Sequence, residues 1–337
     1  MRAEAHKVVL ALTLHSSEVN NPDVQTDKIA EIASRLGIRS NPDGTECSKL
    51  LNQPEIWLRG AVSRVEAAGR LAIVTPFFNP AGYPRVARNF RAFLELLREV
   101  PVFPAEISFG RPWVANGLRL RGSERNVLWQ KERLINLAVS CLPASFDRVA
   151  WFDGDIVLAD ARWYSDTDRA LDQHPVVQVG DTIICDGRAH KMAVAYNFGR
   201  WTKIGYAWAA RRELFPLYDA AIIGGGDMLC AYGWLGRRIR ELTPSPQWFY
   251  HYQNWARRAY GKARGNIGHV AGTLVHFDHG SHAGRHYNER YRLVSGLDPE
   301  VDIAIDDAGL WAWNGNAAST ERFRAALNGF FASRQDG

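Results

Sequence analysis

The stretch from Arg148 to Asp160, RVAWFDGDIVLAD, decides how the fold of this chain is interpreted. Its first half is an apolar run that leads directly into Asp153-Gly154-Asp155. A short apolar run closed by a turn signal is typical of a buried strand. Carboxylates are costly to bury unless they are paired or bound to a metal ion. The end of this strand is therefore either an ordinary surface turn or a place where a cation is bound.

Strands and helices alternate on both sides of this stretch. LAIVTPF, which begins at Leu71, PAEIS and RVAWFD are expected to be strands. Amphipathic helices are expected between them, over 85–100 and 127–142. This order predicts an α/β fold with a mostly parallel, Rossmann-like central sheet flanked by helices. Ligands of such sheets bind beyond the carboxyl ends of the strands, which is where Asp153 and Asp155 lie.

Composition and length limit the class of protein. The chain has 337 residues, of which 46% are hydrophobic and 23% charged, as in ordinary globular proteins. No apolar run approaches the roughly 20 residues of a membrane span, and the start of the chain does not predict a signal peptide. The four cysteines are scattered without CxxC spacing, which indicates a cytoplasmic protein with neither a zinc site nor a disulfide framework. The net charge of +5 suits an anionic ligand.

The sequence predicts three parts. Residues 1–66 are expected to form an N-terminal accessory extension with helical segments. Residues 67–300 are expected to form the catalytic domain, with a nucleotide-binding half (67–160) and an acceptor and metal half (161–300). Residues 301–337 are expected to form a C-terminal tail with a capping helix.

The acid pair suits a hard divalent cation. In a strand, residues i and i+2 point the same way, so Asp153 and Asp155 could face one ligand while Gly154 keeps the space between them open. Mg²⁺ or Mn²⁺ commonly takes one or two carboxylates together with phosphate oxygens. The competing interpretation, a solvated Asp-Gly turn, is less favoured because the pair follows a buried strand.

Five segments, through their order along the chain, resemble GT-A-fold glycosyltransferases of the family-2 and family-8 kind, which use nucleotide-sugar donors. RVAWFDGDIVL resembles their metal-binding DxD signature, and LAIVTPF resembles their first strand. LWQKERLINLAV resembles the helix before the DxD strand, GYAWAARREL with IIGGGDMLC the acceptor segment, and LVHFDHG the late histidine segment. Together the matches extend over about residues 71 to 292. In one departure, Gly226 stands before Asp227 where many inverting members have a Glu-Asp pair, which leaves inversion or retention open.

The resemblance implies a metal site. We expect Asp155 to bind the ion directly and Asp153 to bind the ribose or a metal-bound water. His276 is expected to complete the site, with His279 as the next choice, because imidazole suits Mn²⁺ better than Mg²⁺. The competing interpretation is a surface loop whose histidines contact only water and backbone.

Asp227 is the candidate catalytic base. An acceptor hydroxyl must lose a proton during sugar transfer, and a carboxylate within hydrogen-bond reach can take it. The alternative is that Asp227 is only the N-cap of the helix that follows.

Several side chains are candidates for binding the nucleotide. Arg133 and Asn136, three residues apart, share one helix face, and Arg285 could grip phosphate oxygens from a closing loop. For Arg285 and its neighbour Arg290 a solvated helix face remains an alternative, and for the residues that follow the first strand the alternative is an ordinary turn leading into a helix. The candidates are Thr75, Pro76, Phe77, Arg133, Asn136, Asp153 and Arg285.

The sequence thus predicts a metal-dependent glycosyltransferase that moves a hexose from a nucleotide sugar, expected to be UDP-linked, to a hydroxyl acceptor. The acceptor is a glycan or, as a second choice, a modified base of DNA. A sugar nucleotidyltransferase is an alternative, although TPFFNPAGYPR lacks the glycine-rich basic signature of that class. The other alternative is a non-catalytic module that binds nucleic acid through the basic aromatic stretch Trp248 to Arg264. The oligomeric state stays open.

Overall fold

The computed structural model describes residues 70–334 except 115–116, 186–187, 238, 240–242, 278–289 and 316–317. The expected accessory extension, 1–66, and the candidate residues His279 and Arg285 lie outside the described residues.

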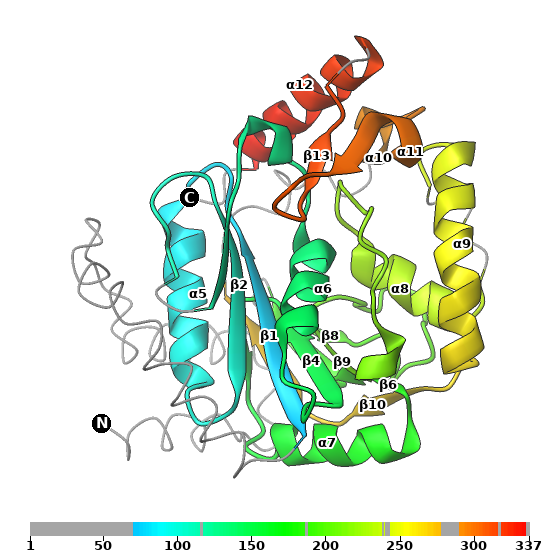
Figure 1. Cartoon of the computed structure of the whole chain (residues 1–337). Helices are drawn as coiled ribbons and strands as arrows, with labels where there is room; N and C mark the ends of the chain where they lie inside the picture. Colours follow the sequence, from blue (N-terminus) through cyan, green and yellow to red (C-terminus); the bar gives the residue numbers. More distant parts are fainter. Residues whose placement is uncertain are drawn as a thin grey trace.

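A seven-stranded sheet forms the centre of the molecule (Figure 1). Its order is β10-β6-β9-β4-β1-β2-β3, and neighbouring strands are parallel except where β9 pairs with β4 and β6. The mostly parallel α/β sheet is therefore confirmed, with one antiparallel strand inserted in it. The strands are β1 (Leu71–Phe78), β2 (Val102–Ser108), β3 (Leu118–Arg121), β4 (Arg148–Phe152), β6 (Val176–Val179), β9 (Ala207–Arg211) and β10 (Ile267–Val270).

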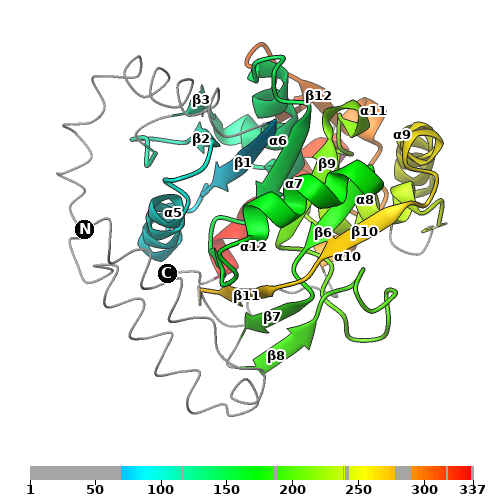
Figure 2. The same ribbon diagram turned by 90° about the horizontal axis from the view of Figure 1, so that it is seen from below.

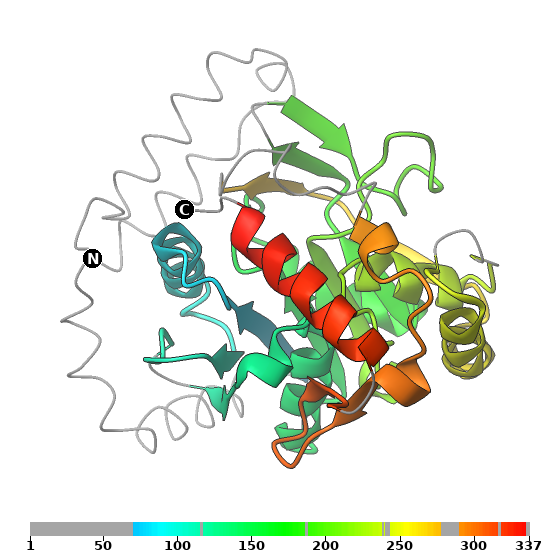
Figure 3. The same ribbon diagram turned by 90° about the horizontal axis from the view of Figure 1, so that it is seen from above.

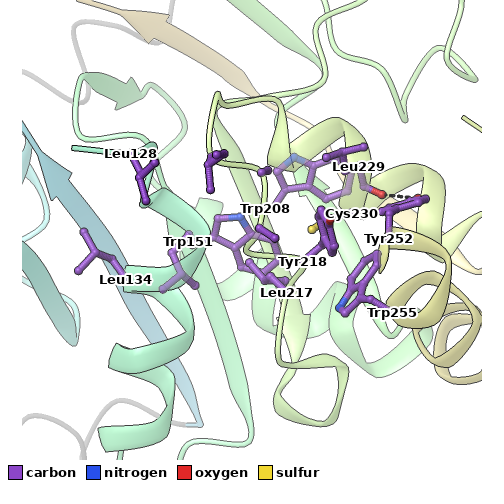
Figure 4. Packing of buried hydrophobic residues seen from close by; sticks show 14 of the residues in the cluster. Leu128, Leu134, Trp151, Trp208, Leu217, Tyr218, Leu229, Cys230, Tyr252 and Trp255 are labelled. Carbon is purple, nitrogen blue, oxygen red and sulfur yellow. Dashed lines mark hydrogen bonds between the residues drawn. The ribbon is translucent and has the colours of Figure 1, made fainter. Parts of the chain in front are cut away.

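Helices cover both faces of this sheet because its strands are apolar on both sides. Along β1, Leu71 and Ile73 pack in the cluster that contains residues of α5 and α7, whereas Ala72 and Val74 pack in the cluster of α6, α8 and α9. Figure 2 shows α7 on its face of the sheet, and Figure 4 shows the aromatic core between β4, β9, α8 and α9. The helices are α5 (Pro84–Leu96), α6 (Lys131–Cys141), α7 (Trp163–Gln173), α8 (Gly226–Trp234) and α9 (Pro246–Ala263).

A second, four-stranded sheet lies beside the first and has the order β5-β11-β7-β8. β11 pairs antiparallel with β5, which places His276 opposite Ile156, and the Phe277 amide donates to the Asp155 carbonyl at 2.7 Å. The late histidine segment is thereby brought to the acid pair. The strands are β5 (Ile156–Leu158), β7 (Thr182–Cys185), β8 (Arg188–Lys191) and β11 (Thr273–His276).

The C-terminal part of the chain packs on the α/β body. Arg125 and Gln130 donate side-chain hydrogen bonds to the carbonyls of Trp313 and Trp311. α12 (Ala318–Ser333) crosses the top of the molecule, and its last turn lies beside the segment that precedes α5 (Figure 3). The remaining elements are η1 (Glu124–Asn126), η2 (Arg212–Leu214), α10 (Arg290–Leu293), α11 (Pro299–Asp302), β12 (Ile303–Ile305) and β13 (Trp311–Trp313).

The aromatic stretch proposed as a binding surface forms α9. Its large side chains Trp248, Tyr252 and Trp255 are buried in the core, while Tyr250 and Tyr260 stay exposed. Three of the six aromatic side chains in this stretch are therefore used for packing and are not available to a nucleic acid. In the described part of the chain, no helix combines the length and the apolar character needed to cross a membrane.

Candidate active site

A cavity of about 500 Å³ opens at the carboxyl ends of β1 and β4. Parallel strands leave their ends at one edge of a sheet, where ligands of α/β proteins bind. The walls come from the end of β1, the turn after β4, the starts of α6 and α8, the end of β11 and the last turn of α12. The side chains that line the cavity include Pro76, Phe77, Phe78, Trp129, Lys131, Glu132, Asp153, Asp155, Asp227, His276, Phe331 and Arg334.

The acid pair lies in a turn between β4 and β5, not in a strand as we expected. Asp153 and Asp155 nevertheless both line the cavity. The role predicted for Gly154 is wrong, because a Cβ atom there would lie 2.0 Å from Cδ2 of Phe90. Glycine is needed for the close approach of α5, and it does not serve to open space for a ligand.

Asp155 and His276 form the first pair of the site. The Nε2 atom of His276 lies 3.6 Å from Oδ2 of Asp155. His276 is buried at the end of β11, whereas the Asp155 side chain is 21% exposed. The pairing of β11 with β5 in the second sheet thus brings the two side chains together. They are close enough to bind one ion together.

Lys131 joins two further acids of the cavity, Asp153 and Asp227. Its Nζ atom lies 2.6 Å from Oδ1 of Asp153 and 2.7 Å from Oδ2 of Asp227. Burial disfavours the charged ammonium, but the two carboxylates outweigh this and raise the pKa of Lys131 well above its usual value. Burial in turn raises the pKa of Asp153, against the attraction of Lys131. Lys131 is therefore a fixed positive charge between the acid pair and the candidate base.

Asp227 occupies the first turn of α8 but does not cap it. The helix begins at Gly226, and its N-cap is Gly225, whose φ of 86° requires the left-handed conformation that glycine adopts easily. The N-cap interpretation of Asp227 is therefore wrong. A Cβ atom at Gly205 would lie 3.3 Å from Oδ2 of Asp227, so a larger residue there would crowd this oxygen. Asp227 lines the cavity, and its side chain is 15% exposed.

Glu132 is a buried acid that the sequence did not single out. It is 2% exposed, and neither carboxyl oxygen has a hydrogen-bond partner in the described part of the chain. A Cβ atom at Gly226 would lie 2.1 Å from the Glu132 carboxyl carbon, so the carboxyl packs directly on the start of α8. Burial, opposed by Lys131 and reinforced by Asp227, raises the pKa of Glu132 to about 8. We therefore expect this carboxyl to keep its proton at mildly acidic pH, where an ordinary glutamate has lost it.

Three nucleotide-binding candidates do not line the cavity. The hydroxyl of Thr75 is buried and donates to the Phe152 carbonyl, which ties β1 to β4. Arg133 and Asn136 both bind Asp219, at 3.2 and 2.9 Å, and so hold the segment before α8. These three predictions are corrected because the polar groups are already used to join elements of the fold.

Pro76 and Phe77 do line the cavity, at the end of β1. On α6, the residues that line the cavity are Lys131 and Glu132, which directly precede Arg133.

A segment with several strained backbone conformations leads into the cavity lining. Asn197, Phe198, Trp201 and Tyr206 all have positive φ, between 50° and 80°. Such conformations cost about 1–3 kcal/mol each for residues other than glycine and gather at functional sites. Residues 202–206, at the end of this segment, line the cavity. The amide of Asp153 donates to the Tyr206 carbonyl at 2.8 Å, which couples this segment to the acid turn.

Comparisons with known proteins add remote likenesses. A scan against protein-family models finds no match, and a search of curated protein sequences finds none either. Among solved structures, glucosyl-3-phosphoglycerate synthase from Mycobacterium tuberculosis, in complex with Mn²⁺, UDP-glucose and phosphoglyceric acid, is 11% identical. The alignment covers 69% of this chain and 79% of that one, with a TM-score of 0.36.

Two further solved structures show the same degree of likeness. A glycosyltransferase involved in the glycosylation of the major capsid of PBCV-1 is 12% identical over 76% of this chain and 98% of its own, with a TM-score of 0.30. A 4-diphosphocytidyl-2C-methyl-D-erythritol synthase from Anaerococcus prevotii is 9% identical over 61% and 90%, with a TM-score of 0.32. At these scores the likenesses do not establish an activity. The site itself has to carry the functional argument.

Proposed function

We propose that this protein is a metal-dependent glycosyltransferase that moves a hexose from a nucleoside-diphosphate sugar, UDP-linked in the first instance, to a hydroxyl acceptor. The observation that carries the proposal is the arrangement of acids in the cavity. Asp155 is paired with His276, and Lys131 links Asp153 to Asp227. These contacts support the proposal of a cation site and a base in one cavity, with the positive charge of Lys131 beside the base.

The donor set fits a metal ion that is shared with its substrate. Among the described residues, no group of three or more His, Cys, Asp or Glu side chains forms a complete metal site. Asp155 and His276 would supply two ligands, and Mg²⁺ or Mn²⁺ readily takes the others from phosphate oxygens and water. The imidazole favours Mn²⁺. When bound, the ion would stabilise the charge that develops on the departing diphosphate.

The protein's own side chains have complementary tasks. Asp227 would accept the proton of the acceptor hydroxyl, since it lines the cavity and its side chain is 15% exposed. Lys131 would hold Asp153 and Asp227 in place and add positive charge near the diphosphate. The cavity of about 500 Å³ has the size of a small-molecule site.

The test is nucleotide release from a panel of sugar nucleotides in the presence of Mn²⁺, Mg²⁺ or EDTA. We expect slow, metal-dependent release of a nucleoside diphosphate from one donor, and a loss of at least about 100-fold in Asp155→Ala. Asp160→Ala is the matched control, because this acid follows β5 outside the cavity lining. If no donor is bound or cleaved with any metal, the proposal is wrong. Consumption of a nucleoside triphosphate with a sugar phosphate would instead identify a nucleotidyltransferase.

A further inference from the structure

The chain between β8 and the cavity wall forms a closed loop over residues 191–203, which we call the 191–203 loop. Its two ends are joined, because the Lys203 amide donates to the Lys191 carbonyl at 2.8 Å. Gln178, buried on β6, also holds the loop: its side chain accepts from the Val194 amide at 2.9 Å and donates to the Lys203 carbonyl at 3.2 Å. The loop starts at the end of β8, the edge strand of the second sheet (Figure 2). The fold therefore fixes the course of this loop.

The 191–203 loop exposes aromatic side chains on a strained backbone. Trp201 is 80% exposed and Tyr196 is 41% exposed. Trp201 has a φ of 70°, and Asn197 and Phe198, which lie between the two rings in the chain, have φ of 50° and 56°. Such a backbone costs free energy and gathers at functional sites. Because the exposed Trp201 ring returns little of this cost through packing, the combination indicates a binding surface.

The loop and the strand before it carry positive charge without an acid of their own. Residues 188–206 contain no aspartate or glutamate and four cations, Arg188, Lys191, Arg200 and Lys203. Within the described residues, none of these cations has a carboxylate within 4.0 Å. The Nζ atom of Lys191 lies 4.5 Å from the centroid of the Tyr196 ring, and the guanidinium carbon of Arg200 lies 4.9 Å from that of Trp201. Positive charge that no acid balances attracts an anion. A fitting ligand thus offers a flat face to a ring and an anionic group to the cation beside it.

The loop leads into the wall that contacts the candidate base. Residues 202–206, which directly follow Trp201, line the cavity. A Cβ atom at Gly205 would lie 3.3 Å from Oδ2 of Asp227, so this wall touches the group that would take the proton of the acceptor hydroxyl. An acceptor whose hydroxyl reaches Asp227 therefore lies beside residues 202–206. The next residue along the chain from this wall is the exposed Trp201.

We propose that the acceptor is an anionic saccharide, with a carboxylate or phosphate group that binds Lys191 and Arg200 and a sugar ring that packs on Trp201. The inference rests on the proposed function and names the class of its acceptor. In the transfer, the acceptor oxygen forms a bond to the anomeric carbon of the hexose, the bond from that carbon to the diphosphate breaks, and Asp227 takes the hydroxyl proton.

A saccharide fits this path better than a nucleic acid. The hydroxyl that receives the hexose has to reach Asp227 within a cavity of about 500 Å³. The sugar at the end of a saccharide chain can enter such a cavity while the next sugars stay on the 191–203 loop. A nucleic-acid base would first have to leave its stack, which costs a few kcal/mol.

The experiment is calorimetric titration of the full chain, in EDTA and without a donor, with two matched pairs of saccharides. One pair is tetragalacturonate and its neutral methyl ester, and the other is a phosphate monoester of maltotetraose and maltotetraose itself. A single-stranded oligonucleotide is the third probe. The EDTA removes metal ions that an anionic probe could otherwise bind in the acid site.

The variants are Lys191→Gln, Arg200→Gln and Trp201→Leu. Arg169→Gln and Tyr250→Leu are the matched controls, because these side chains are 75% and 64% exposed on α7 and α9, away from the cavity lining. Thermal unfolding of each variant checks that it is folded.

We expect the wild type to bind at least one anionic saccharide more tightly than its neutral counterpart, and the anion that it prefers identifies the acidic group. Each loop variant should weaken this binding by about 5- to 10-fold, or about 1.0–1.4 kcal/mol at 1.4 kcal/mol per tenfold, whereas the two controls should leave it unchanged. The preference should shrink when NaCl is raised from about 0.05 to about 0.3 M, because salt screens exposed charges.

Three results would overturn the inference. The first is equal binding, or no binding, of the charged and neutral member in both pairs. The second is a preference for the anion that the loop variants do not change. The third is tighter binding of the oligonucleotide than of either anionic saccharide, which would make nucleic acid the occupant of the loop. None of these results affects the proposed transfer from a nucleotide sugar, which fails only if the donor panel shows no binding and no cleavage.

Discussion

Replacing Glu132 with glutamine isolates the effect of one buried carboxyl on stability. Burial raises the pKa of Glu132 from 4.5 to about 8, with Lys131 opposing the rise and Asp227 adding to it. Between these two pH values the folded chain keeps a proton on Glu132 that the unfolded chain has released. Glutamine has nearly the same shape and no proton to release, so the pH-dependent contribution disappears in Glu132→Gln.

The sign and size of the effect follow from linkage. Since the folded state binds more protons, the free energy of unfolding falls as pH rises, by about 1.4 kcal/mol per unit. The contribution is complete below a pH of about 4.5 and is lost as pH rises through about 8. From pH 5 to pH 8 it amounts to roughly 3 to 4 kcal/mol, against a typical total of about 5–15 kcal/mol. The buried amide of the variant costs roughly 1–3 kcal/mol at every pH.

The assay is urea unfolding in EDTA at pH 5, 6, 7 and 8, with the difference between the two proteins plotted against pH. Groups that do not interact with Glu132, such as His251, whose pKa burial lowers, titrate alike in both proteins and cancel in this difference. Glu95→Gln is the control, because the side chain is 72% exposed on α5. A difference that changes by less than about 0.5 kcal/mol over this pH range would refute the argument that Glu132 is protonated in the folded state.

Two further substitutions test the packing and the charges of the site. Gly154→Ala would place a methyl group against Phe90. We expect the free energy of unfolding, measured in urea, to fall by about 1–3 kcal/mol, and we expect adding Phe90→Leu to restore part of it. An unchanged stability would contradict the packing role of Gly154. Lys131→Met would remove the ammonium between Asp153 and Asp227, and we expect a destabilisation of about 2–4 kcal/mol at pH 8. That loss should shrink at pH 4, where Asp153, whose pKa is raised by burial, takes up a proton; equal losses at both pH values would argue against the charge interpretation.

Local patterns predicted the fold well where strands and helices alternate. The strands from Leu71, through Pro104 and from Arg148 occur in the expected order because each is a short apolar run between turn signals. The insertion of β9 between β4 and β6, antiparallel to both, was not predicted. The apolar pattern of a strand that is buried on both faces does not show its direction.

The side chains of the site were harder to predict than the strands. On α6, the spacing from Leu134 to Cys141 indicated the apolar stripe, but Lys131 and Glu132 are buried at its start. Charged residues at buried helix positions break the 3.6-residue pattern, so the sequence selected Arg133 and Asn136, on a face of α6 that does not line the cavity. The pairing of Asp155 with His276 depends on contacts of β11 with β5, residues far apart in the chain. The sequence predicted this pairing only through the resemblance of the DxD and late histidine segments to those of glycosyltransferases.

The turn at Gly154 also separates two structural bodies. Asp153 directly follows β4 of the large sheet, whereas the backbone of Asp155 is hydrogen-bonded to the end of β11 in the small sheet. Two carboxylates one residue apart are thus carried by different sheets. Any ion that both of them bind would link the two sheets. The distance between the two carboxylates would then change with the relative position of the sheets.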